Sequence, residues 1–377
     1  MANQGFKVMD SDIDVMEPGD LWVKYIHPKY RDRAPRREQL PDGGGMVWRS
    51  EGKVLPAFSD HPKRRALNAA RAQRSQQNFE RYREAKDRQY DAVSQLQAME
   101  VEGIDVAVGF RTLGSHVIAI DDMDPELAAA MCRAFNRWLA DFCREDPHRL
   151  KGAGIVPLHD VKQAVQEARY AVEELGMVAL VLPSNPVNKR NLYDPYFDRL
   201  WAEAQDLGVP VAFHGLHAAY QDHVANRYMD NLTLVHASSH PVELMLTLGA
   251  MLCGGVFHRF PDLRAAYLEG TCGWVPWWLW RLDEEWEKFG AGEGAITEHP
   301  SFYFKRQCFV SVEPSETLVK QVVEVMGDDQ LVISTDWPHD DSAYPHAIES
   351  FLSIEGLNDD TRRKVLWDNC ARLYGVA

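Results

Sequence analysis

Several features that would restrict the function are missing from this 377-residue chain. It has no apolar run as long as a membrane span, and its N-terminus lacks the basic and apolar regions of a signal peptide. The six cysteines are scattered without close pairs, which excludes a cysteine-rich zinc site and favours a reduced, cytoplasmic protein. The net charge of −15 argues against nucleic acid or an anionic membrane surface as a partner.

Two catalytic motifs are absent as well. The chain contains no Gly-x-Ser-x-Gly elbow and no glycine-rich phosphate loop, so serine hydrolases and kinases are excluded. What is present is 45% hydrophobic residues, enough for a sizeable core, arranged in alternating strand-like and helix-like segments.

Eight strands are expected, ending near residues 12, 108, 156, 182, 213, 269, 312 and 335. Helices are expected between them, at about 125–144, 160–175, 195–207, 241–253, 274–288 and 315–326. This alternation predicts a (β/α)8 TIM barrel formed by residues 1–377 as a single domain. A doubly wound open sheet is the alternative, although no glycine-rich turn follows the first strand.

An insertion near residues 27–100 interrupts this pattern. Residues 27–62 are rich in Pro, Gly and Arg and lack periodicity, which predicts a long loop or lid over the site. Residues 63–102 are helical in type, and their basic run is typical of a solvated helix face. This helix is also a candidate surface for a homodimer.

The last predicted strand runs directly into an acid. The apolar run from Leu331 to Ile333 leads to Asp336, and Pro338 cannot continue a central strand. Barrel enzymes place their chemistry at the C-terminal ends of such strands. Asp336 therefore either belongs to an active site or caps the following helix.

The first predicted strand is acidic. Asp10, Asp12 and Asp14 share one face of it, and Glu17 follows just beyond its end. Carboxylates repel one another in apolar surroundings, and a bound cation relieves that repulsion. The alternative is a solvated acidic edge strand.

Other strand ends add polar side chains to the same mouth, namely His214 and Glu269. His240, just before Pro241 at an expected helix start, is a further candidate ligand, and His217 and His236 are weaker ones. His339 either supports a ligand carboxylate or lies on a surface turn. Mixed His, Asp and Glu ligands suit iron, manganese or zinc.

At these motifs the chain resembles the amidohydrolase-related proteins of the aminocarboxymuconate-semialdehyde decarboxylase type. The resemblance covers nearly the whole chain, least clearly residues 40–75, and rests on Asp10–Pro18 with Leu21-Trp22, Phe260–Arg264, Leu268–Gly270, Gly273–Pro276 and Ser334–His339. It implies a metal-dependent barrel whose metal residues match Asp12, Asp14, His214 and Asp336.

The chain departs from that family in two positions. Asp14 stands where family hydrolases and decarboxylases usually carry a ligand histidine, and Glu269 where the decarboxylases carry a histidine used in the chemistry. Extra carboxylates favour two adjacent metals, with Glu17 and His240 completing the set. This variant is similar to a branch of the family that binds a non-haem diiron centre and activates dioxygen.

The resemblance therefore implies a diiron monooxygenase with Asp336 and Glu269 as catalytic residues. Its substrate would be bulky and largely apolar, such as a diterpenoid, as a free acid or coenzyme A thioester in antibiotic biosynthesis. An external electron donor would be needed. Trp274, Trp277, Trp278, Trp280 and Trp337 either line an apolar pocket or pack on helix faces.

Two alternatives remain open. The first is a mononuclear hydrolase or decarboxylase, in which a metal-bound water is the nucleophile or base and Asp336 is both ligand and general base. The second is a catalytically inactive binding barrel, in which the acidic cluster is structural.

Overall fold

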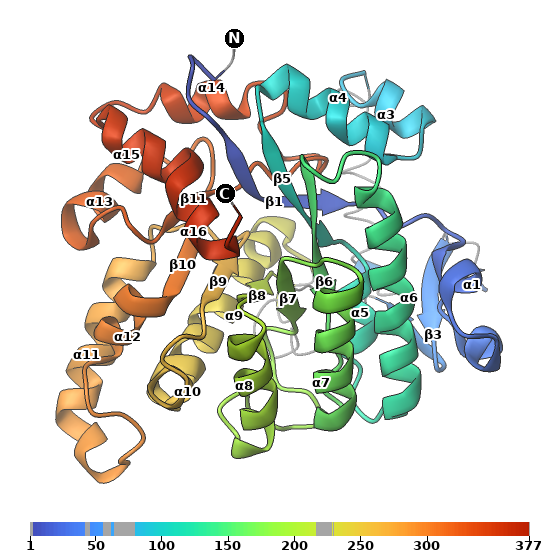
Figure 1. Ribbon diagram of the computed structural model, residues 1–377, viewed down its shortest axis with the longest axis horizontal. Helices are drawn as coiled ribbons and strands as arrows, with labels where there is room; N and C mark the ends of the chain where they lie inside the picture. Colours follow the sequence, from blue (N-terminus) through green and yellow to red (C-terminus); the bar gives the residue numbers. More distant parts are fainter. Residues whose placement is uncertain are drawn as a thin grey trace.

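The computed structural model describes residues 3–41, 46–55, 62–63, 80–215, 228 and 230–376. Eight parallel strands form one sheet in the order β1-β5-β6-β7-β8-β9-β10-β11, which confirms the predicted barrel (Figure 1). The strands are β1 (Met9–Val15), β5 (Val106–Arg111), β6 (Leu150–Ile155), β7 (Ala179–Leu182), β8 (Val211–His214), β9 (Ala265–Leu268), β10 (Cys308–Val312) and β11 (Leu331–Ile333).

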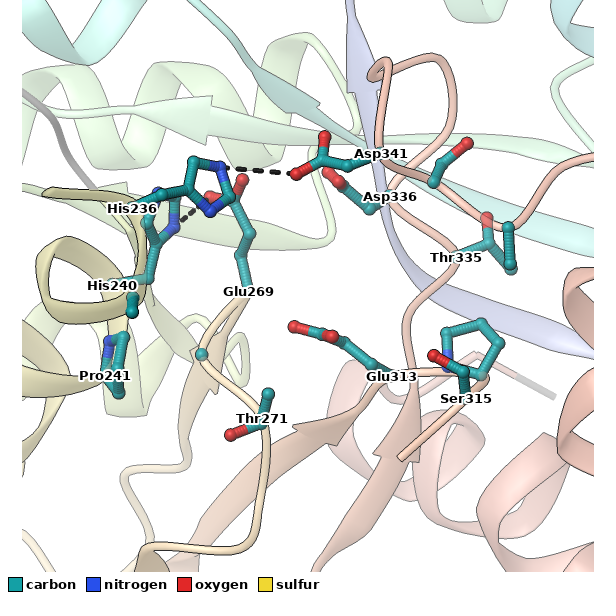
Figure 2. Close-up of a pocket in the computed structure, with 15 residues that line it drawn as sticks. His236, His240, Pro241, Glu269, Thr271, Glu313, Ser315, Thr335, Asp336 and Asp341 are labelled. Carbon is teal, nitrogen blue, oxygen red and sulfur yellow. Dashed lines mark ion pairs between the residues drawn. The ribbon is translucent and has the colours of Figure 1, made fainter. Parts of the chain in front are cut away.

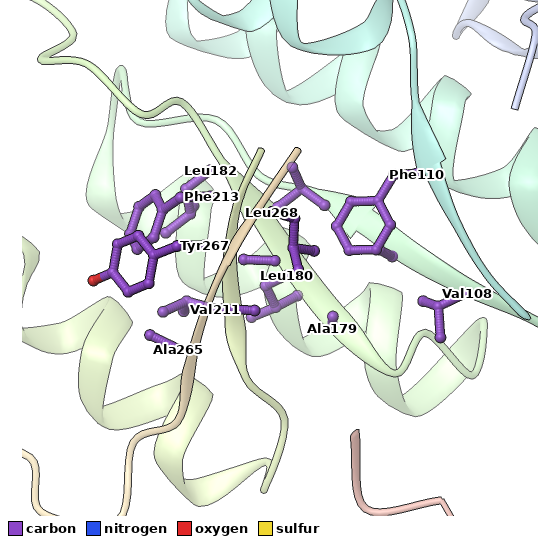
Figure 3. Close-up of a cluster of buried hydrophobic side chains, with 14 of the residues drawn as sticks. Val108, Phe110, Ala179, Leu180, Leu182, Val211, Phe213, Ala265, Tyr267 and Leu268 are labelled. Carbon is purple, nitrogen blue, oxygen red and sulfur yellow. The ribbon is translucent and has the colours of Figure 1, made fainter. Parts of the chain in front are cut away.

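Burial on both faces explains why these short segments are strands. β7 is a run of four apolar residues, all of them fully buried. Parallel strands covered by helices have this continuous apolar character. Figure 3 shows the resulting core, in which Phe213 stacks on Tyr267 from the neighbouring strand at a ring-centroid distance of 5.4 Å.

The barrel closes between its first and last strands mainly through side chains. Ser11 Oγ donates a hydrogen bond to the Ile333 carbonyl (2.5 Å), and the Asp14 amide donates one to the Trp337 carbonyl (2.8 Å). Tyr374, in the last helix, donates its hydroxyl to the Ser11 carbonyl (2.7 Å). These contacts bring the acids of β1 next to Asp336.

Helices cover the outside of the barrel (Figure 1). Those of eight or more residues are α4 (Ala92–Glu102), α6 (Pro125–Cys143), α7 (Val161–Arg169), α8 (Asp198–Asp206), α9 (Leu232–Cys253), α11 (Val275–Phe289), α12 (Pro300–Gln307) and α13 (Val319–Met326). Shorter helical segments are α1 (Leu21–Tyr25), α3 (Arg83–Asp87), α5 (Gly114–Ile118), α10 (Val256–Arg259), α14 (Ala347–Leu352), α15 (Asp359–Arg363) and α16 (Asn369–Tyr374). No helix among the described residues is long and apolar enough to cross a membrane.

Two expectations about the elements were wrong. The segment expected to be a loop contains an antiparallel sheet of β2 (Arg36–Gln39), β3 (Met46–Ser50) and β4 (Lys53–Leu55). The helix expected from residue 241 begins nine residues earlier, at Leu232, and continues through Pro241. The helical character of residues 63–102 is confirmed by α3 and α4, whereas residues 64–79 lie outside the described residues.

Candidate metal centre

Three predicted ligands converge at the C-terminal ends of β1 and β8. His214 Nε2 lies 3.2 Å from Asp12 Oδ2 and 4.0 Å from Asp14 Oδ2, and all three side chains are 1% exposed. We call Asp12, Asp14 and His214 the inner cluster. Their ligand atoms lie within 4.8 Å of one another, which is close enough for one cation to contact all three.

The hydrogen bonding of the inner cluster tests whether its donor atoms suit a metal. Oδ1 of Asp12 and Oδ2 of Asp14 are buried and have no hydrogen-bond partner within the described part of the chain, and Oδ2 of Asp12 and Nε2 of His214 have only each other, at 3.2 Å. Buried polar atoms are normally paired, because an unpaired one costs roughly 1–3 kcal/mol. Two carboxylates and an imidazole also match the preferences of manganese, iron and zinc. The donor set therefore fits a divalent cation.

A second group of side chains shares Asp14 with the inner cluster. Ligand atoms of Asp14, Glu269, Asp336 and His339 also lie within 4.8 Å of one another, and we call these four residues the outer cluster. His339 Nδ1 is 2.7 Å from Asp336 Oδ1 and 3.4 Å from Asp14 Oδ2. His339 thus lies beside the ligand carboxylates rather than on a distant surface turn.

Glu269 connects the clusters to helix α9. Its Oε2 lies 3.0 Å from His214 Nδ1 and 2.9 Å from His240 Nδ1. A carboxylate at Nδ1 orients the His214 ring so that Nε2 faces the aspartates. His240 comes this close to the strand ends only because residue 215 is glycine: a Cβ there would lie 2.0 Å from His240 Nδ1.

Burial and neighbouring charges act against each other at these groups. Burial by itself lowers the pKa of His214, but Asp12 and Glu269 outweigh it and raise the pKa to about 9. Burial raises the pKa of Asp336 well above its usual value. Burial would also raise the pKa of Glu269, but His240 and His214 outweigh it and hold that pKa well below the usual range.

The backbone is strained at two of these positions. Glu269 and Asp336 adopt φ angles of +59° and +56°, in the left-handed region that side chains other than glycine seldom adopt. Such conformations cost roughly 1–3 kcal/mol and cluster at functional sites. Glu269 directly follows β9 and Asp336 lies three residues beyond the end of β11, and both carboxyl groups turn into the barrel mouth.

Arg111 does not pair with Asp14. The Arg111 guanidinium is buried at the end of β5, lies 2.8 Å from His214 Nδ1 and donates a hydrogen bond to the His214 carbonyl (3.1 Å). Burial lowers its pKa, while Asp14 and Glu269 oppose that effect. It therefore fixes the strand end that carries His214 and supplies positive charge beneath the clusters.

The structure does not bring Glu17 or Asp10 into either cluster. Glu17 accepts hydrogen bonds from the backbone amides of Thr112, Leu113 and Gly114 at 2.8–3.1 Å. Asp10 accepts one from the Thr335 amide (3.2 Å) and one from its hydroxyl, and burial raises the pKa of Asp10 to about 8. Both acids hold the barrel together next to the site.

A cavity of about 400 Å³ opens over the clusters. In Figure 2, His236 and His240 lie on one side of it, and Asp336 and Asp341 on the other. His236, on the described helix α9, lies 3.3 Å from Asp341 and so also reaches the cavity. His217 lies outside the described residues.

The cavity wall is mostly polar. Ten of its fifteen described lining residues are polar or charged, and none of the five tryptophans considered for an apolar pocket is among them. Trp274 and Trp278 donate to the carbonyls of Gly270 and Met245, and Trp337 packs against Tyr82. These three aromatic side chains therefore pack against neighbouring segments of the protein and do not line the cavity.

Sequence reasoning missed two cavity acids, Glu313 and Asp341. Glu313 directly follows β10, so the rule that identified the other strand-end acids would have found it. Asp341 lies in the loop after β11, and nothing in its sequence surroundings distinguishes it.

Comparison with known proteins gives a consistent family assignment. The sequence profile of the family described as Amidohydrolase matches residues 51–376. The 2-amino-3-carboxymuconate-6-semialdehyde decarboxylase of Dictyostelium discoideum is 26% identical over 255 residues, which is 67% of this chain and 68% of that protein.

Solved structures show the same fold. An amidohydrolase from Mycobacterium avium subsp. paratuberculosis has a TM-score of 0.77 at 22% identity and covers 98% of this chain and 100% of its own. A dihydroxybenzoic acid decarboxylase from Polaromonas, with bound manganese and the inhibitor 2-nitroresorcinol, has a TM-score of 0.68 at 18% identity, covering 99% and 97%.

These relatives overturn the expectation of a monooxygenase. The Dictyostelium and Polaromonas relatives are named as decarboxylases, which are lyases, and nothing in the comparisons supports the diiron oxygenase branch or a role in antibiotic biosynthesis. The decarboxylase alternative has the better support. A metal is bound in the solved Polaromonas relative, whereas two irons and dioxygen are not shown for this chain.

Proposed function

Because this chain belongs to the amidohydrolase family, we propose that it is a metal-dependent decarboxylase acting on a small carboxylic acid. The observation that carries this proposal is the inner cluster, whose buried donor atoms lie next to Glu269 and Asp336, two residues that line a cavity at the C-terminal face of the barrel. The cavity volume of about 400 Å³ is at the small end of the range for small-molecule sites, which is roughly 300–1,000 Å³.

Asp12, Asp14 and His214 would hold the cation, and it would act there as a Lewis acid toward the substrate carboxylate. Decarboxylation breaks the bond between carbon and CO2 and places a proton on that carbon, with no net oxidation. The external electron donor expected for an oxygenase is therefore not required. What the chain must supply is a proton at the cavity surface.

The Asp336–His339 pair is suited to hold that proton. Asp336 lines the cavity, and its Oδ1 lies 2.7 Å from His339 Nδ1, so the proton is shared between these two atoms. Burial raises the pKa of Asp336, which favours the protonated carboxyl. Glu269 would orient His240 through the 2.9 Å contact to Nδ1, and His240 would position the substrate.

The number and identity of the ions stay a prediction. Manganese is proposed because a solved structural relative contains it, and zinc or iron would suit the same ligands. The outer cluster shares Asp14 with the inner one and offers a second position. Elemental analysis of protein purified without added metal counts the ions directly.

The test is CO2 release from a panel of small acids by manganese-loaded protein. The panel contains 2,6-dihydroxybenzoate and 2-amino-3-carboxymuconate semialdehyde, with metal-stripped protein as the control. We expect metal-dependent release from at least one acid, and loss of release in Asp336→Asn while manganese stays bound. No release from any acid by fully loaded protein would refute the proposed function.

A further inference from the structure

Glu313 is a cavity carboxyl group that belongs to neither cluster. It directly follows β10, so it stands at the same C-terminal edge of the barrel as Glu269 and Asp336. Figure 2 shows its side chain extending into the cavity, across from His240 and near Thr271. Its position is therefore set by the strand rather than by an exposed loop.

The surroundings of this carboxyl group leave it without a protein partner. No hydrogen bond or ion pair joins its side chain to any residue that the structure describes. Burial, followed by the charges of Glu316 and Glu269, raises the pKa of Glu313 to about 7. A half-buried acid with a perturbed pKa in a cleft is typical of a functional group.

Its neighbour on the same loop gives the contrast. The carboxylate of Glu316 accepts hydrogen bonds from the backbone amides of Cys272 and Gly273 at 2.8–3.1 Å. Glu316 therefore ties two strand-end loops together. Glu313, three residues earlier, makes no such connection within the described chain and faces the cavity instead.

The charge of the surroundings limits what Glu313 can bind. Glu316, Glu269 and Asp341 raise the pKa of Glu313 and outweigh His240, which lowers it, so this side of the cavity already carries more acids than bases. A second carboxylate would be repelled there, whereas a hydrogen-bond donor would pair with Glu313 and offset the cost of its burial.

We propose that Glu313 determines substrate specificity by accepting a hydrogen bond from a hydroxyl or amino substituent of the acid whose carboxylate lies at the inner cluster. This inference rests on the proposed function for the orientation of the substrate. A site built to hydrogen-bond a substituent discriminates strongly against an analogue that lacks the donor, because its own polar group is then left unpaired. Glu313 acts in recognition and takes no part in breaking the carbon–carbon bond.

Binding of ring-substituted benzoates to manganese-loaded protein tests the proposal. The probes are the monohydroxy, monoamino and monomethoxy benzoates, compared at each ring position by calorimetry. We expect the hydroxy or amino compound to bind at least about tenfold more tightly than the methoxy compound at one position. Glu313→Leu should reduce that preference to within about twofold, and Glu313→Gln, which keeps an accepting oxygen, should retain part of it.

The matched control is Glu324→Gln, which changes an exposed acid on helix α13 and should keep the full preference. Absence of any preference in the wild-type protein, or an unchanged preference in Glu313→Leu, would overturn the inference. Neither result depends on turnover. Loss of CO2 release with the preference intact would instead refute the proposed function alone.

A second measurement needs no ligand. If Glu313 has no structural partner, replacing it with leucine should raise the melting temperature of the metal-loaded protein, by about 2 °C. If the carboxyl group is structural, the same substitution should lower the melting temperature, and that outcome would also overturn the inference.

Discussion

Asp12→Asn removes one charge from the inner cluster, and the distances there predict its effect on stability. At an effective dielectric constant of about 20, the attraction across 3.2 Å between Asp12 and a protonated His214 is about 5 kcal/mol. The repulsion between the oxygens of Asp12 and Asp14, which lie within 4.8 Å, is at least about 3.5 kcal/mol. The two effects largely cancel, and burial, which raises the pKa of Asp12, further reduces what its charge contributes, so the metal-free variant should lose at most about 2 kcal/mol of stability.

The effect on metal binding should be larger than the effect on the metal-free fold. Manganese at one hundred times its dissociation constant stabilises a protein by about 2.7 kcal/mol, or about 3 °C in melting temperature for a chain of this length. Partners that merely support a ligand change metal affinity by about 10–100-fold, so losing a ligand itself should cost at least 100-fold. The stabilisation by manganese at the same concentration should then fall to about 0.4 kcal/mol, or about 0.5 °C in melting temperature.

Thermal unfolding with and without chelator measures both quantities in one experiment. Glu17→Gln is the matched control, because Glu17 binds backbone amides near the site and should keep the manganese-dependent gain. An equal gain in Asp12→Asn and the wild-type protein would show that the cation does not bind at Asp12. Loss of the manganese-dependent stabilisation in Glu17→Gln would show that Glu17 is a metal ligand after all.

Three further outcomes are expected. Glu269→Gln should lower CO2 release at least about 100-fold and also reduce the manganese-dependent gain in melting temperature, since it weakens the contacts to His240 and to the ligand His214; unchanged turnover would contradict this role. Gly215→Ala should displace the His240 ring, whose Nδ1 would lie 2.0 Å from the new Cβ, and lower kcat at least about tenfold in the same assay; an unaltered kcat would mean that the ring position does not matter. Burial raises the pKa of Glu167, on helix α7, from 4.5 to about 7. Between these pH values the folded state binds a proton that the unfolded state has lost, so the free energy of unfolding should fall by about 3 kcal/mol from pH 4.5 to pH 7. Urea unfolding at both pH values measures this effect, and the Glu167→Gln variant should not show the decrease in stability. An equal decrease in the variant would mean that other groups cause it.

The barrel could be predicted because the apolar sequence of each strand indicates its burial without reference to the rest of the chain. Runs such as residues 179–182 are buried on both faces, so every residue in them is apolar. The strands of the small antiparallel sheet carry no such signal: all four residues of β2, Arg36–Gln39, are exposed. The start of α9 was misplaced because Pro241 is typical of a first helical turn, and here the packing of the helix against the barrel outweighs that local preference.

The site could be predicted only where strand ends determine it. Asp12, Asp14, His214, Glu269 and Asp336 follow from the rule that parallel strands direct their C-terminal residues to one mouth, and the structure brings all five together. The placement of other residues depends on contacts between distant segments. Glu17, for example, is held by amides more than ninety residues away, which its own sequence surroundings cannot reveal.

The charge of the mouth determines the order in which ligands bind. Without a cation, Glu269 and Asp336 line the cavity that an anionic substrate must enter, and Asp14 lies beside them. Protonated His214 offsets only part of this negative charge. Arg111 cannot reverse that charge alone, because its donors are already directed to His214 and the adjoining backbone. At about 4 Å and an effective dielectric constant of about 20, each ionised carboxylate repels an incoming one by about 4 kcal/mol. A divalent cation at the inner cluster would attract the substrate with twice the charge of any single acid, so we expect the metal to bind before the substrate, and metal-free protein to bind carboxylic acids more weakly than manganese-loaded protein.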